Sequence, residues 1–107
     1  MMRERNRPPV HPGRIIGSHY VKALDMNITS LAGILGISRK TASKIVNERG
    51  AVTPDMALRL SRAFNTTPHL WLGLQQECDL WHAAHDSSEW KKVQSAEALQ
   101  KVSEQTL

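Results

Sequence analysis

Apolar residues recur every three to four positions in five segments of the chain, a spacing that is typical of amphipathic helices. The first segment covers residues 12–24 and begins with Pro12, which suits a first helical turn because the N–H group that proline lacks would have no partner there. Its apolar residues at helical spacing are Ile15, Ile16, Tyr20, Val21 and Leu24. No segment shows the alternation of a strand, so the pattern predicts an all-α protein.

Hydroxyl residues mark where the next two helices begin, because such side chains cap the free N–H groups of a first turn. We expect Thr29 to cap a short second helix that ends at Leu35 or Gly36, where a left-handed residue reverses the chain. Ser38 then caps a third helix, which is expected to run to about Asn47.

The last two predicted helices each open with a threonine followed by a proline, a combination that places a cap just before the first helical position. Thr53 and Pro54 open the fourth helix, and Thr67 and Pro68 open the fifth, which extends to about His85. The predicted architecture is therefore a five-helix domain with flexible ends.

The periodic pattern covers residues 11–85, which we interpret as one domain. Residues 1–10 contain a proline pair and no apolar period, so they are interpreted as a flexible basic arm. Its cations are Arg3, Arg5 and Arg7. Residues 86–107 include helix-forming residues, but their apolar positions drift around the helix, which indicates a frayed helix or a flexible tail.

Composition narrows the class of protein. The chain has 107 residues, of which 40% are hydrophobic and 22% are charged, as in ordinary globular proteins. Its net charge of +4 suits a polyanionic partner. Cys78 is the single cysteine, and the sequence has neither a signal-peptide pattern nor an apolar run as long as a membrane span. We therefore expect a cytoplasmic protein that does not bind membranes.

The second and third predicted helices, with the short segment between them, have the composition of a helix-turn-helix unit. Ala32 is small enough for two helices to cross closely, Gly36 reverses the chain, and Ile37 and Ile45 fill the angle between the helices. Such a unit presents the N-terminal end of its second helix to the major groove of DNA. The sequence therefore predicts that the helix after Ser38 is a recognition helix.

The side of this helix opposite its apolar residues carries the side chains that DNA recognition uses. Lysine and arginine bind phosphates or guanine, asparagine pairs with adenine, and hydroxyl groups donate to either phosphates or bases. The candidate DNA-binding residues are Ser38, Arg39, Lys40, Thr41, Ser43, Lys44 and Asn47. The alternative is a solvated surface with no ligand, but the neighbouring turn and helix favour a double-stranded DNA operator as the partner.

These segments together resemble the HigA-type antitoxins, which belong to the phage-repressor-like helix-turn-helix regulators and include virulence-associated protein I. The resemblance covers roughly residues 8–85. It rests on "PPVHPGRII", "LAGILGISRKTASKIVN", "VTPDMALRLSRAFNTTPHLWLGLQ" and "DLW". Two positions depart from the family pattern: Gly17 replaces a larger polar residue, and Gly73 stands where asparagine is common.

The resemblance implies an antitoxin of a type II toxin-antitoxin module. Such a protein binds and silences a ribosome-dependent ribonuclease toxin, and its homodimer represses the shared operon. Two alternatives stay open: a stand-alone phage-repressor-like regulator without a toxin, and a protein-interaction module whose DNA-binding surface is vestigial.

The fifth helix has a wide apolar side that is suited either to a dimer interface or to the core, since large aromatic residues serve both. The candidate interface residues are Leu70, Trp71, Leu74 and Trp81. Cys78, His82 and His85 share one side of the same helix, but a fourth zinc ligand is not evident. We therefore predict no metal and no cofactor, and because no nucleophile and base are linked by their spacing, no enzymatic activity.

Overall fold

The computed structural model describes residues 7–98, which contain five bounded α-helices and no strand, and residues 96–98 are also helical. In chain order the α-helices are α1 (Pro12–Ile15), α2 (Ile28–Leu35), α3 (Arg39–Val46), α4 (Pro54–Phe64) and α5 (Pro68–Asp86). A π-helix, η1 (Ile16–Lys22), continues α1, and a 3-10 helix, η2 (Glu89–Lys92), follows α5. The predicted five-helix, all-α architecture is confirmed for the described residues.

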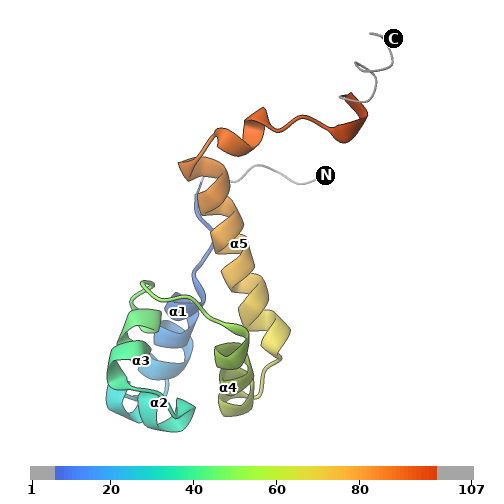
Figure 1. Ribbon diagram of the computed structural model, residues 1–107. Coiled ribbons are helices and arrows are strands. Elements are labelled where there is room, and N and C mark those ends of the chain that lie inside the picture. The colour runs from blue at the N-terminus through green and yellow to red at the C-terminus, as the bar shows by residue number, and fades with distance from the viewer. Residues whose placement is uncertain (1–6, 99–107) are drawn as a thin grey trace, which may run out of the picture.

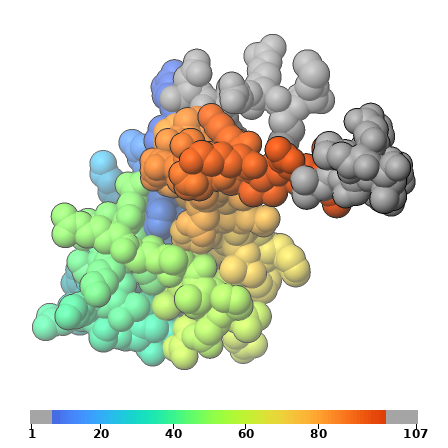
Figure 2. Space-filling model, turned by 45° about the horizontal axis from the view of Figure 1, so that its top comes forward, coloured from blue at the N-terminus to red at the C-terminus, as the bar shows by residue number. Residues whose placement is uncertain are grey.

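Helices α1 to α4 gather around one half of the long helix α5, whose other half projects from this group (Figure 1). The described residues after α5 lie at the end of the molecule opposite α2, α3 and α4 (Figures 1 and 2). The described part of the predicted C-terminal tail therefore leaves α3 uncovered. Arg3 and Arg5 of the predicted arm, and residues 99–107 of the tail, lie outside the described residues.

Three of the four predicted helix caps are confirmed. The hydroxyl oxygens of Ser38, Thr53 and Thr67 each accept a hydrogen bond from the backbone N–H three residues later, at 3.1 to 3.2 Å. The prediction for Thr29 is wrong, because α2 begins at Ile28 and Asn27 caps it with an Oδ1 that accepts from Ser30 N at 2.8 Å. Asparagine is as good a cap as a hydroxyl residue, so the sequence offered two competing start signals.

The first predicted helix is only partly correct. It is α-helical from Pro12 to Ile15 and changes to π-helical bonding from Ile16 to Lys22. Because a π-turn takes more residues than an α-turn, positions beyond Ile16 shift away from the 3.6-residue pattern. Leu24, which the pattern placed inward, lies beyond the helix and is 60% exposed.

The core lies where α2, α3, α4 and α5 meet around the start of η1. Its largest fully buried side chains are Trp71, Ile16, Leu31 and Leu60. Trp71 donates its Nε1–H to Thr66 Oγ1 at 2.7 Å, so the polar atom of this aromatic residue is satisfied. Tyr20 stacks on Phe64 with ring centroids 4.0 Å apart and also contacts Trp71, which joins η1, α4 and α5.

A very close approach joins α1 to the C-terminal end of α3. A Cβ atom at Gly13 would lie 1.7 Å from the carbonyl oxygen of Ile45, so no larger residue fits without moving one of the two helices. His11 caps the same turn through its Nδ1, which accepts from Gly13 N at 2.9 Å. The C-terminal end of α3 therefore rests directly on the backbone of α1.

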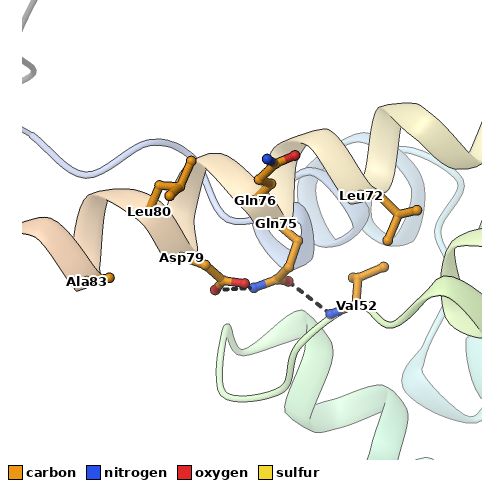
Figure 3. A pocket seen from close by; sticks show the side chains of 7 residues that line it. All are labelled: Val52, Leu72, Gln75, Gln76, Asp79, Leu80 and Ala83. Carbon is orange, nitrogen blue, oxygen red and sulfur yellow. Dashed lines mark hydrogen bonds between the residues drawn. The ribbon is translucent and has the colours of Figure 1, made fainter. Parts of the chain in front are cut away.

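The loop between α3 and α4 is tied to α5 by a buried glutamine. Gln75 Oε1 accepts from Val52 N at 2.9 Å, and its Nε2 donates to Asp79 Oδ1 at 3.0 Å (Figure 3). Because Gln75 is only 7% exposed, both ends of its amide need these partners. This contact fixes the chain that leaves α3 against the long helix.

Candidate nucleic-acid interface

The turn between α2 and α3 has the geometry that the sequence predicts. Gly36 ends α2 in the left-handed region, with φ 67° and ψ 39°, where a glycine carries no steric penalty. The N–H of Ile37 donates to Ala32 O at 3.0 Å and closes the end of the helix. Three residues, 36–38, separate the end of α2 from the start of α3.

The apolar side of α3 anchors it to the domain. Ala42 is fully buried and Ile45 is 4% exposed, while Val46 and Ile37 pack against the core as partly buried residues. Ala32 of α2 is 3% exposed, as expected for the small residue at a close helix crossing. Packing therefore determines which side of α3 faces the solvent.

The opposite side of α3 faces solvent. Six of the seven candidate DNA-binding residues are exposed, and Ser43 is partly exposed. The exposed ones are Ser38, Arg39, Lys40, Thr41, Lys44 and Asn47. The structure thus brings the seven side chains to a single outward-facing surface, which is here called the α3 surface.

The hydroxyl and amide groups of the α3 surface are bonded to one another. Ser38 Oγ donates to Thr41 Oγ1 at 2.9 Å and accepts from the backbone N–H of Thr41. Asn47 Nδ2 donates to Ser43 Oγ at 3.2 Å. These short bonds hold the polar side chains close to α3.

Positive charge on this surface is not neutralised within the described part of the chain. The three ion pairs found there are Asp55–Arg59, His82–Asp86 and Glu89–Lys92, and none involves Arg39, Lys40 or Lys44. The first turn of α3 contains no acidic residue. Its free N–H groups and the positive end of the helix dipole add to the attraction for an anion.

Arg59 of α4 contacts the helix-turn-helix turn, a feature that sequence analysis missed. Its Nη1 donates to the carbonyl oxygens of Leu35 and Gly36 at 2.8 and 3.0 Å, and its Nε donates to Asp55 Oδ2 at 2.7 Å. The four-residue spacing of Asp55 and Arg59 was visible in the sequence as a helical ion pair. The carbonyl contacts, 23 and 24 residues away, had no signal in the sequence.

The candidate dimer residues separate in the structure. Trp71 has no exposed surface and belongs to the core of its own chain, so its assignment to an interface is wrong. Leu70 is 45% exposed, and Leu74 is partly buried against the core. Trp81 is partly exposed, and the ring of His85 stacks on it at 4.0 Å. The wide apolar side of α5 therefore serves the core at Trp71 and faces outward at Leu70.

An open groove of about 480 Å³ runs along another side of α5 and was not predicted. Its apolar lining comes from Leu72, Leu80 and Ala83, with Val52 on the facing loop (Figure 3). Leu80 is 58% exposed. A partly open apolar surface of this kind is typical of a contact with another chain.

The three residues considered for zinc have other partners. The Cys78 thiol donates to the carbonyl oxygen of Pro9 at 3.3 Å, His85 Nδ1 lies 2.7 Å from the carbonyl oxygen of Trp81, and His82 pairs with Asp86. Within residues 7–98, no group of three His, Cys, Asp or Glu side chains is placed to hold a metal ion. None of the helices in that part of the chain is both long and apolar enough to cross a membrane.

Comparison with known proteins places these features in context. The helix-turn-helix family model matches residues 20–72. An uncharacterized HTH-type transcriptional regulator of Haemophilus influenzae is 41% identical over 80 residues, 75% of each chain. Antitoxin HigA-1 of Vibrio cholerae is 32% identical over 80 residues, again 75% of each chain. The solved structure of Pseudomonas aeruginosa antitoxin HigA with the higBA promoter is 32% identical, with a TM-score of 0.73, over 82% of this chain and 98% of that chain.

Proposed function

Because this chain belongs to the helix-turn-helix family that includes the HigA-type antitoxins, we propose that it binds an operator through the α3 surface and represses transcription. The observation that supports this most is that the exposed cations of α3 have no acidic partner among the described residues. The solved relative with its promoter supports the same proposal. Because a bacterial operator lies on DNA in the cytoplasm, the proposed operator binding places this protein in the cytoplasm.

The proposed binding mode follows from the geometry of α3. Its N-terminal end enters the major groove, which is about 12 Å wide and admits a helix. Arg39, Lys40 and Lys44 reach phosphates or guanine edges, and the Ser38 end of the helix faces a phosphate. Asn47 exchanges its bond to Ser43 for a bidentate pair with an adenine.

We further propose that the chain binds DNA as a homodimer that uses α5. Leu70 and Leu80 expose apolar surface on this helix, and Trp81, the residue after Leu80, is a partly exposed aromatic residue. Aromatic and apolar residues with these exposures are common in subunit interfaces. Two α3 helices related by a two-fold axis would meet half-sites about one helical turn, or roughly 34 Å, apart.

Binding to the promoter DNA of its own gene tests the operator and the dimer together. The chain is expected to bind such a duplex at least about 1,000-fold more tightly than a scrambled duplex, and to protect two half-sites spaced by one helical turn. Equal affinity for the two duplexes would contradict the operator assignment. A single protected half-site, with a monomer in sedimentation equilibrium, would contradict the dimer.

The second part of the proposal is that the protein neutralises a ribonuclease toxin by direct binding. Its support is the similarity to HigA-1, which is named an antitoxin. Co-expression with the neighbouring small gene is expected to prevent growth arrest, and a Lys40→Ala/Lys44→Ala variant is expected to prevent it equally, because toxin binding does not require the α3 surface. If the product of the neighbouring gene arrests growth and the wild-type chain does not prevent that arrest, the toxin assignment is wrong.

The similarity to the Haemophilus influenzae regulator supports a second candidate, a regulator that acts without a toxin. Both candidates require the same operator contacts, so DNA binding does not separate them. A neighbouring gene that does not arrest growth when expressed alone would favour the stand-alone regulator.

A further inference from the structure

The guanidinium group of Arg59 joins α4 to the end of α2 and to the turn that follows α2. It extends from α4, is held at Nε by Asp55 one turn earlier, and donates from Nη1 to the carbonyl oxygens of Leu35 and Gly36. The side chain is 41% exposed, so it lies at the edge of the domain and not in its core. The two carbonyl groups are the last of α2 and the turn residue that follows it.

The bonds from Arg59 supply hydrogen-bond donors to carbonyl groups at the end of α2 and in the turn. The last carbonyl groups of a helix have no partner within the helix, and they form the negative end of its dipole. A guanidinium group offers several donors in a rigid plane and always carries a positive charge. Arg59 therefore supplies both the donors and the charge that the end of α2 lacks.

The turn determines where α3 begins. Ser38, the cap of α3, comes two residues after Gly36, so a change in the peptide plane of Gly36 would move the N-terminal end of α3. At its other end α3 is fixed by the close approach of Gly13 to Ile45. Among the described contacts, the two bonds from Arg59 are the only side-chain hydrogen bonds to backbone atoms of residues 35–37.

We propose that Arg59 is a positioning residue for operator recognition, which fixes the N-terminal end of α3 at the angle that its reading residues need. It acts through the carbonyl groups of Leu35 and Gly36 and does not contact DNA. This inference rests on the proposed operator binding, and it assigns a role in recognition to α4, which lies outside the helix-turn-helix unit.

The chain offers a matched control for the test. Arg62 lies three residues further along α4, is exposed, and forms none of the side-chain bonds found in the described residues. Arg59→Ala and Arg62→Ala remove the same charge from the same helix. Arg59→Lys keeps the charge and a single donor nitrogen with three N–H groups, but not the rigid plane of donors.

We expect Arg59→Ala to lose at least about tenfold in affinity for the operator, the worth of one base contact, while affinity for a scrambled duplex changes no more than in Arg62→Ala. The salt dependence of binding should be the same in the two variants. In the absence of DNA, amide exchange at Gly36 and Ile37, whose N–H groups donate to Gly33 O and Ala32 O, should accelerate in Arg59→Ala only. Arg59→Lys should recover part of the operator affinity.

Four results would overturn the inference. Equal operator affinity of the Arg59→Ala and Arg62→Ala variants would show that Arg59 has no special role. A weaker salt dependence in Arg59→Ala, with loss on both duplexes, would show a direct phosphate contact. Faster exchange throughout the chain, with binding per folded molecule unchanged, would show a role in stability alone. Unchanged amide exchange at the turn in Arg59→Ala would contradict the positioning role of Arg59 alone. The proposed function itself would fail if the wild-type chain bound the operator and the scrambled duplex equally well.

Discussion

Replacing Lys40 and Lys44 together by alanine is expected to weaken operator binding by at least about tenfold, since contacts to DNA are each worth about 1–3 kcal/mol. Both residues are exposed on α3 and have no ion-pair partner among the described residues. Changes at such surface positions alter the free energy of unfolding by less than about 0.5 kcal/mol, so the fold should persist. A titration at several salt concentrations, with the melting temperature as a check, measures the two effects separately.

The salt dependence identifies which contacts are lost. If both lysines contact phosphates, the slope of log affinity against log salt should become shallower by about 1 for each, or about 2 in total. The control is Lys91→Ala/Lys92→Ala, which removes the same charge from the exposed helix η2 at the far end of the molecule (Figure 1). Equal losses in the two double variants would mean that net charge matters and the α3 surface does not.

Replacing Trp71 by alanine is expected to lower the free energy of unfolding by about 3–5 kcal/mol, a large part of the total for a small domain. The side chain is fully buried, contacts Tyr20 and donates to Thr66, so its removal leaves a cavity and an unused acceptor. Denaturant unfolding followed by circular dichroism at 222 nm measures the loss, because that signal does not depend on the tryptophan itself.

The matched variant is Trp90→Ala on η2. Trp90 is 51% exposed, and its Nε1 donates to the carbonyl oxygen of Ser87, so the expected loss is below about 1 kcal/mol. Trp71→Phe keeps most of the buried ring and should fall between the two. A Trp71→Ala protein as stable as Trp90→Ala would mean that Trp71 does not pack in the core.

Local signals predicted much of this fold because they act within one helical turn. Thr53, Thr67 and Ser38 each cap the helix that follows them, and Gly36 adopts the left-handed conformation that the turn requires. The burial of Ala42 and Ile45, with lysines on the opposite side, follows directly from helical periodicity. The placement of the α3 surface could therefore be predicted from consecutive residues alone.

The features that were missed depend on contacts between distant residues. A tryptophan suits a core and a subunit interface equally well, so the sequence does not distinguish the two locations for Trp71. The structure does, because Trp71 is fully buried and contacts the ring of Tyr20. Arg59 and Gln75 are ordinary helix-surface residues in the sequence, yet each bonds to backbone atoms 23 or 24 residues away. Such partners are known only once the helices are placed.

The close approach of Gly13 to the carbonyl group of Ile45 allows the DNA sequence preference to change during evolution while the position of α3 stays the same. Helix α3 packs on the domain through backbone atoms and inward-facing residues, so replacing its outward-facing cations is expected to leave the fold intact. Related repressors could exchange Arg39, Lys40, Thr41, Lys44 or Asn47 and acquire a new target without rebuilding the scaffold. Position 13, by contrast, is expected to stay glycine whatever the target is.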